Sequence, residues 1–496
     1  MKNITLCLAL TCYSCLLIAQ TVKPDSTFGG TGQIETNLAD KNLNPYGYNL
    51  ALLPNGEVVI VGAPYEDSLG AKKYRNDGTL DAGFTTILGG FAQNHFGASL
   101  QKDGKAIVSG YLSKAPFYSA VARLNLNGGM DASFGNNGIA SVFLRHAYET
   151  NLLELANEKI IIFGSEDINN SNIPTVVTRL NANGTIDSSF GINGTFRRDI
   201  LNGPEFIPAG VEQADGKLLF AGMVNYRLLL LRLNPDGTLD STFSEDGILI
   251  NPMPLVSEAY CIHLQTDEKI IVGGYSDPSY KPIIARFNPN GTPDSTFGDA
   301  GIHNFADLSE GQEGVGIVVL PNGKIIMLLA DLAEDVVRLA QLLPNGQRDL
   351  SFGNNGIYQY TGSNLRSRSL RLNGNKLTIS GRNEDTYQIF LLRLLLELNV
   401  GTLNPNTPAE PSLWVYPNPI TNQFTLKFGL SQKEPVNIHL FDMNGKQVQS
   451  FVQNQSFEPG EHDLNFTCVN FLPAGNYVLT FEVAGKKRTS IQILKK

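Results

Sequence analysis

Leu233-Asn234-Pro235-Asp236-Gly237-Thr238-Leu239-Asp240-Ser241-Thr242-Phe243 is one copy of a phrase that recurs along most of this chain. Its core is Asp-x-x-Phe, usually followed by Gly, and successive copies lie 56, 50, 56, 53, 54 and 55 residues apart. A regular period of this size indicates one array of supersecondary units, not several independent domains. The seven pairs are Asp25 and Phe28, Asp81 and Phe84, Asp131 and Phe134, Asp187 and Phe190, Asp240 and Phe243, Asp294 and Phe297, and Asp349 and Phe352.

Each unit contains four short runs typical of β-strands. In the fifth unit they cover residues 247–250, 259–264, 269–273 and 283–288, and Gly, Pro and Asn separate them. Asp-Gly or Asn-Gly turns, such as Asp215-Gly216, join the second run to the third in most units. Four antiparallel strands repeated at this spacing predict a β-propeller, whose blades bury their faces against their neighbours.

The ends of the array predict the number of blades. A seventh unit follows Asp349, but Asn404 replaces the next Asp and Thr407 stands where Phe belongs. The missing copy is Asp25-Ser26-Thr27-Phe28, so we expect the N-terminus to complete the last blade and close a ring of seven. The predicted fold is all-β: a seven-bladed β-propeller over residues 20–404, followed by a small C-terminal β-sandwich.

The array resembles the delta-60 repeat proteins of Bacteroidetes and related bacteria. Residues 233–243 and Asp103-Gly104-Lys105 carry this resemblance, which extends from residue 25 to about residue 404 and implies a propeller-like fold without an assigned activity. We expect the repeated Asp to accept backbone N–H bonds and the Phe to fill the gap between blades. Two alternatives stay open: calcium binding, for which Asp236 and Asp240 lack a third acidic partner, and O-glycosylation at Asp-Ser-Thr, a short motif of that phylum.

The first residues and the composition predict the compartment. Met1-Lys2-Asn3 and the mostly apolar run 4–19 form a predicted signal peptide over residues 1–19, because the run is too short to cross a bilayer. Lipid attachment at Cys15 is the alternative. A net charge of −9 argues against a nucleic acid partner, and no other run could span a membrane. Cys261 and Cys468 fall in different domains and form no metal cluster, and we expect a monomer without a cofactor.

The C-terminal residues have a different pattern. A Pro-rich linker over 405–412 precedes a tail, 413–496, whose alternating strands predict a small β-sandwich. The tail looks like a type A sorting domain of the type IX (Por) secretion system. The residues that carry this resemblance are Val415-Tyr416-Pro417-Asn418-Pro419, 440–446, 472–479 and the basic end 486–496. It implies contact with the secretion machinery, transport across the outer membrane, removal of the tail, and release or attachment at the cell surface.

A ligand site should break the symmetry of the repeat, so the variable loops between third and fourth strands are its candidate location. They carry acids and tyrosines that suit glycan stacking or cation binding. A surface polysaccharide is therefore a candidate partner, although exposed loops are polar in any protein. The candidate rim residues are Tyr65, Glu66, Asp67, Glu166, Asp167, Tyr275, Asp277, Glu384, Asp385 and Tyr387.

Signals of catalysis are weak. The six histidines are scattered without metal-ligand spacing, and neither Gly-x-Ser-x-Gly nor His-Glu-x-x-His occurs. Adjacent acids such as Glu66-Asp67 cannot act as a catalytic pair, since glycoside hydrolysis needs carboxylates about 5 to 9 Å apart. The sequence predicts an exported, non-enzymatic binding or adhesion module with no catalytic or metal-binding residues. A glycan lyase or hydrolase, or a purely structural surface protein, is the alternative; unlike polar side chains converging in the central channel would favour the enzyme.

Overall fold

The computed structural model describes residues 20–495 apart from short gaps. The gaps are residues 39–45, 54, 65–67, 93–94, 114–117, 146, 167–172, 202, 251–255, 277, 279, 332–335, 363, 399–412, 417–419, 421–422, 431, 443–446, 468–474 and 484–486. The predicted signal peptide and the predicted linker lie outside the described residues. The chain divides into two compact units between residues 399 and 400.

The first unit is the predicted seven-bladed propeller. Its described strands form seven antiparallel sheets, numbered here as blades 1 to 7. Each blade has one strand nearest the ring axis. From blade 1 to blade 7 these inner strands are β3 (Tyr46–Leu52), β9 (Ala98–Leu100), β13 (Ala147–Glu154), β17 (Glu205–Glu212), β21 (Glu258–Leu264), β25 (Gln312–Val319) and β29 (Leu365–Asn373).

The next two strands of each blade are almost fully buried, because neighbouring blades cover both of their faces. The second strands are β4 (Val58–Ala63), β10 (Ala106–Leu112), β14 (Ile160–Glu166), β18 (Leu218–Val224), β22 (Ile270–Ser276), β26 (Ile325–Asp331) and β30 (Lys376–Asn383). The third strands are β5 (Ser68–Tyr74), β11 (Tyr118–Leu124), β15 (Thr175–Leu180), β19 (Arg227–Leu233), β23 (Lys281–Phe287), β27 (Arg338–Leu342) and β31 (Ile389–Leu398).

The outer strand of each blade comes from the next sequence unit, so blades are offset from repeats by one strand. The outer strands of blades 1 to 6 are β6 (Leu80–Gly89), β12 (Ile139–Arg145), β16 (Thr195–Arg198), β20 (Ile248–Ile250), β24 (Ile302–Asn304) and β28 (Ile357–Gln359). Two short strands, β7 (Phe91–Ala92) and β8 (His95–Phe96), extend the sheets of blades 2 and 3.

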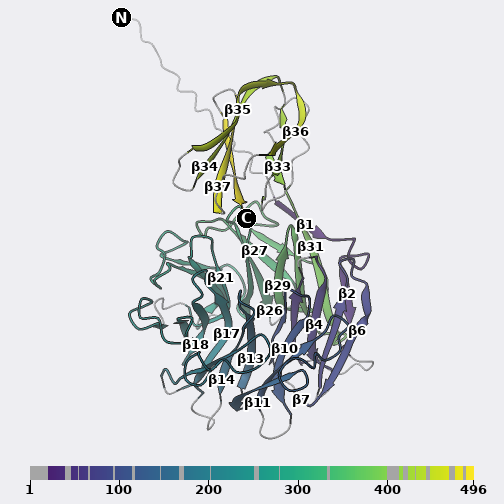
Figure 1. Cartoon of the computed structure of the whole chain (residues 1–496), viewed down its shortest axis with the longest axis vertical. Helices are drawn as coiled ribbons and strands as arrows, with labels where there is room; N and C mark the ends of the chain where they lie inside the picture. The colour runs from purple at the N-terminus through teal and green to yellow at the C-terminus, as the bar shows by residue number, and fades with distance from the viewer. Residues whose placement is uncertain are drawn as a thin grey trace, which may run out of the picture. The chain divides into compact units, whose positions relative to one another are not determined.

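Blade 7 is completed by the N-terminus, which confirms the predicted closure. β1 (Gln20–Pro24) and β2 (Gln33–Thr36) both pair antiparallel with β31, from Gln20 opposite Leu398 to Thr36 opposite Ile389. Figure 1 shows the purple β1 beside the green β31. The ring therefore joins the first described strand of the chain to the last strand of the propeller.

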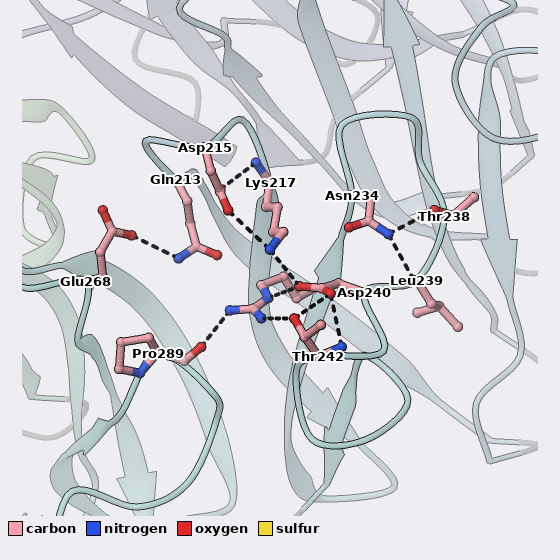
Figure 2. Close-up of polar contacts among 11 residues, drawn as sticks. Gln213, Asp215, Lys217, Asn234, Thr238, Leu239, Asp240, Thr242, Glu268 and Pro289 are labelled. Carbon is pink, nitrogen blue, oxygen red and sulfur yellow. Dashed lines mark hydrogen bonds and ion pairs between the residues drawn. The ribbon is translucent and has the colours of Figure 1, made fainter.

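The repeated Asp organises a contact between neighbouring blades (Figure 2). Asp240 is buried and accepts the backbone N–H and hydroxyl of Thr242, while its other oxygen lies 2.6 Å from Nε of Arg232. The same guanidinium donates to the carbonyl of Pro289 in the turn of the next blade, at 2.6 Å. Burial opposes ionisation of Asp240, but the bonds from Thr242 and the charge of Arg232 outweigh it and lower its pKa to about 2.

The repeated Phe lies beneath this ion pair. The Arg232 guanidinium carbon is 4.6 Å from the centre of the Phe243 ring. A Cβ at Gly291 of the next blade, where φ is 90°, would lie 2.9 Å from the Phe243 ring, so only Gly fits there. The arrangement recurs at Arg123, Arg179 and Arg286, and at the closure Arg393 lies 4.1 Å from Phe28 and bonds to Asn76 of blade 1.

The second unit is a β-sandwich, as predicted. One sheet contains β32 (Leu413–Tyr416), β33 (Gln423–Leu430) and β36 (Gly460–Thr467). The other contains β35 (Gln447–Phe457), β34 (Glu434–Asp442), β37 (Gly475–Val483) and β38 (Lys487–Lys495). Phe424, Leu426 and Phe428 of the first sheet share a core with Ile438 and Phe481 of the second. β32 and the long, polar β35 were not predicted from the sequence.

The described residues contain strands and turns only. No helix among them is long and apolar enough to cross a membrane.

Candidate functional site

The inner strands of the propeller carry a bulge near their start. The pairing shifts by one residue at Tyr260 in β21, at Val315 in β25 and at Arg368 in β29. A bulge leaves one residue unpaired and turns its side chain away from the regular alternation. Each bulged residue, together with the residue two positions before it, lines the central channel: Glu258 and Tyr260 in blade 5, Glu313 and Val315 in blade 6, and Arg366 and Arg368 in blade 7.

The channel is a cavity of about 1080 Å³, and all seven blades contribute to its lining. Its volume is at the upper end of the usual range for small-ligand sites. The wall differs from blade to blade at equivalent positions, since Phe206 and Pro208 of blade 4 stand where blade 5 has Glu258 and Tyr260. The sevenfold regularity of the fold is therefore lost at the surface of the channel.

Blades 5 and 6 bring two carboxylates to one phenol. The hydroxyl of Tyr260 lies 3.4 Å from Oε2 of Glu258 and 3.5 Å from Oε1 of Glu313. Burial and the charge of Glu258 raise the pKa of Tyr260, so the phenol keeps its proton. Burial also raises the pKa of Glu313, against the opposing charges of Arg368 and Arg366. The group therefore combines the Tyr260 hydroxyl, which stays protonated and can donate a hydrogen bond, with the carboxylates of Glu258 and Glu313 as acceptors.

Aromatic rings continue this group toward the loop between β22 and β23. The Tyr275 ring centre lies 5.9 Å from that of Tyr260 and 4.9 Å from that of Tyr280, and the Tyr275 and Tyr280 planes are stacked at 11°. Tyr280 is 49% exposed and has a φ of 44°, a backbone conformation that residues other than glycine rarely adopt. Two flat rings thus stand at the edge of the polar group.

Blade 7 presents positive charge to the same channel. Arg366 lies directly opposite Arg382 in the pairing of β29 with β30, and Arg368 is the bulged residue beside them. Arg382 is neutralised by Glu384, which accepts bonds of 2.8 and 2.5 Å from Nε and Nη2. Among the described residues, Arg366 and Arg368 make no ion pair within 4 Å.

The structure brings together only part of the predicted rim. Tyr275 joins the Tyr260 group, and Glu384 lines the channel through its pairing with Arg382. Tyr387 is exposed near Arg382, and Asp385 accepts a bond from Asn364. Glu166 is 5% exposed and forms an ion pair with Arg197, which leaves it little access to a ligand. Tyr65, Glu66, Asp67, Asp167 and Asp277 lie outside the described residues.

Sequence reasoning missed the channel residues Glu258, Tyr260, Glu313, Arg366 and Arg368. The signal was present, because these positions differ between units while the strands around them repeat. A ligand site was expected in the loops alone, whereas a strand position faces the channel only because of a bulge that the sequence does not reveal. Within the described residues, no three His, Cys, Asp or Glu side chains are grouped to hold a metal ion.

Family comparisons assign both units. Residues 414–496 match the secretion system C-terminal sorting domain. Residues 101–134, 155–190, 213–243 and 265–297 match the domain of unknown function (DUF5122) beta-propeller. The sorting domain indicates export to the cell surface or the extracellular space. No curated protein sequence matches the chain.

Solved structures with a similar fold include propellers of differing description. A polysaccharide lyase of family PL25, an ulvan lyase bound to -[GlcA(1-4)Rha3S]-, is 10% identical with a TM-score of 0.45, over 73% of this chain and 96% of that one. The Cps50 (Swd1) beta-propeller domain of Myceliophteria thermophila is 11% identical with a TM-score of 0.43, over 72% and 98%. A protein of unknown function from Dyadobacter fermentans DSM 18053 is 10% identical with a TM-score of 0.41, over 74% and 100%.

Proposed function

Because the chain carries DUF5122 propeller repeats and a secretion system C-terminal sorting domain, we propose that it is an exported, monomeric propeller that binds a glycan at its central channel. The observation that carries this proposal is the Tyr260 group with its neighbouring ring pair, Tyr275 and Tyr280. Sugars present hydroxyl groups around a ring with apolar faces. The site offers a phenol donor and carboxylate acceptors near the exposed ring of Tyr280, which is stacked on Tyr275, and these groups are complementary to both features.

A glycan array probed with the full chain, with and without calcium, tests the proposal. We expect binding to one or a few glycans, and removing the exposed ring by Tyr280→Ala should weaken it about tenfold. Tyr226→Ala is the matched control, since Tyr226 has a similar φ of 60° and is 68% exposed on the turn of blade 4. The absence of binding in both conditions would sink the proposal, and so would equal losses in the two variants.

The proposed route of export begins with cleavage after Ala19 and ends with removal of the tail beyond the 405–412 linker. β1 begins at Gln20, so the proposed cleavage leaves the strand that closes the ring intact. Mass spectrometry of the exported protein tests both cuts. An N-terminus beyond Pro24 would contradict the first, and a surface protein that keeps residues 413–496 would contradict the second.

Glycoside hydrolysis is the second candidate, and the unlike polar side chains that converge in the channel favour it, because such convergence is the arrangement expected of a propeller enzyme. Glu258 and Glu313 come from neighbouring blades and both contact the Tyr260 hydroxyl, so the two contacting oxygens lie at most about 7 Å apart, a distance compatible with a catalytic pair. The raised pKa of Glu313 suits a general acid. If the protein is a hydrolase, a bound glycan should release new reducing ends, and Glu313→Gln should abolish release while binding persists. If the glycan stays intact after long incubation, the protein binds it without hydrolysing it.

A further inference from the structure

Four arginines line the blade 7 wall of the channel, and three of them, Arg366, Arg368 and Arg382, lie near the start of β29 or opposite it, although the protein as a whole carries a net charge of −9. Arg366 and Arg382 are cross-strand partners, and like charges directly opposite each other destabilise a sheet. Arg368 adds a third charge through the bulge of the same strand. Such a concentration of positive charge needs a compensating anion.

The protein itself supplies only part of that compensation. Glu384 holds Arg382 through two bonds. The charges of Arg368 and Arg366 act to lower the pKa of Glu313 of blade 6. Within the part of the chain that the structure describes, however, Glu313 forms no ion pair with either arginine. The repeat arginines are different, because Arg232 and its equivalents each bind a buried Asp. Among the residues that the structure describes, Arg366 and Arg368 therefore have no acidic partner for their donors in the channel.

An unpartnered hydroxyl lies on the same strand. Ser369 follows Arg368, lines the channel, and is only 6% exposed, yet its Oγ has no hydrogen-bond partner among the described residues. Within the same described part of the chain, Ser367 on this strand and Ser380 on β30 are also buried with unpartnered hydroxyls. Buried polar groups are almost always paired in folded proteins, so an unpaired group calls for a missing partner. A ligand oxygen beside Ser369 would supply one.

We infer that Arg366, Arg368 and Ser369 form an anion subsite, and that the glycan of this protein is acidic. This inference rests on the proposed function. The carboxylate of a uronic acid or a sulfate ester would accept charge-assisted bonds from the two guanidinium groups and a third from Ser369. The uncharged part of the sugar would extend across the channel toward Tyr260 of blade 5.

Titration calorimetry on the full chain with three probes tests the inference. The probes are hexagalacturonate for carboxylate, a carrageenan hexasaccharide for sulfate, and neutral xylohexaose of the same length. We expect at least one acidic probe to bind at least tenfold more tightly than xylohexaose, and its affinity to fall as NaCl rises from 20 to 200 mM. Whichever acidic probe binds more tightly identifies the anion.

Three variants localise the effect. Arg366→Gln and Arg368→Gln should each weaken the acidic probe about tenfold and leave xylohexaose unchanged. Arg198→Gln is the control, since Arg198 is an exposed arginine on the outer strand of blade 3. Equal affinity for acidic and neutral probes, or equal effects of the three variants, overturns the subsite while the glycan-binding function stands. If none of the probes and no glycan on the array binds, the proposed function fails and the subsite fails with it.

Discussion

At the scale of a residue, the repeat depends on a buried carboxylate that stays charged. Asp240 joins its own turn to Arg232, and Arg232 joins blade 4 to the turn of blade 5. Removing one partner of such a pair leaves the other charge buried and uncompensated, which costs more than the pair contributes. One residue per unit thus fixes a turn and a blade interface together.

Asp240→Asn should lower the free energy of unfolding by about 3 kcal/mol, because it leaves Arg232 without its counter-charge. The measurement is urea denaturation of the purified chain. Asp236→Asn is the control, since Asp236 makes the same local contacts with Thr238 but is exposed. Equal midpoints for the two variants would contradict this role of Asp240.

The lowered pKa of Asp240 also predicts acid sensitivity. Its folded value of about 2 lies below its ordinary value of 3.8, so its contribution to stability is complete above about pH 4 and is lost as the pH falls toward 2. Asp187 and Asp294 are lowered in the same direction by similar hydrogen bonds. We expect the melting temperature to fall steeply between pH 4 and 2, and Asp240→Asn to make that slope shallower. A slope unchanged in the variant would refute the assignment.

Arg366→Gln is expected to stabilise the fold while it weakens ligand binding. It removes one of two directly opposed charges, for which a gain of about 0.5 kcal/mol is reasonable. Thermal melting at low salt shows the gain, which should shrink as salt screens the repulsion. A lower melting temperature than wild type at every salt concentration would show that the Arg366 side chain supports the wall by packing.

At the scale of an element, the sequence predicts strands well and their side-chain directions less well. Asp-x-x-Phe and Asp-Gly turns are local signals, so the runs around them became strands where expected. The direction of Glu258 depends on the bulge at Tyr260, which is a property of the pairing with β22 and leaves no local mark in the sequence. β35 was not predicted because its many polar residues, including Gln453, Asn454 and Gln455, obscure the alternation of apolar and polar residues that marks a strand.

The facing walls of β25 and β29 predict a pH dependence of binding. Glu313 has a pKa raised by burial, so it loses its charge as the pH falls through a value above its ordinary 4.5, while Arg366 and Arg368 keep theirs. Affinity for a sulfated oligosaccharide, which stays ionised, should therefore rise several-fold between pH 7 and 5. Glu313→Gln should reduce the rise without abolishing it, because His263 also lines the channel and gains charge in acid. A level pH profile in wild type would contradict this account.

At the scale of the whole molecule, the ring depends on its closure. The sequence predicted it from a single observation, the displaced copy of the motif at Asp25. In the structure, Asp25 forms an ion pair with Lys376 at 3.2 Å, and Phe28 lies against Arg393, which is 1% exposed. The linker and the loops of blades 1 to 3 had no such repeated signal, and much of them lies outside the described residues.

Deletion of residues 20–36 should prevent formation of a stable ring. It removes β1 and β2, the outer partners of β31, and leaves a long apolar strand edge unpaired, which favours aggregation. Size-exclusion chromatography and near-ultraviolet circular dichroism measure the effect. Deletion of the tail from residue 413 is the control and should leave the propeller folded. A monomeric, folded product from the first deletion would show that the closure is dispensable.

The pairing of Gln20 with Leu398 also sets the order of events during synthesis. Strands of blades 1 to 6 lie near their partners in the chain, but β1 must wait until almost the whole propeller has been made. Contacts between such distant residues form slowly. A chain still being synthesised therefore cannot close the ring, and a prematurely terminated chain would lack β31 and would expose unpaired N-terminal strands to proteases.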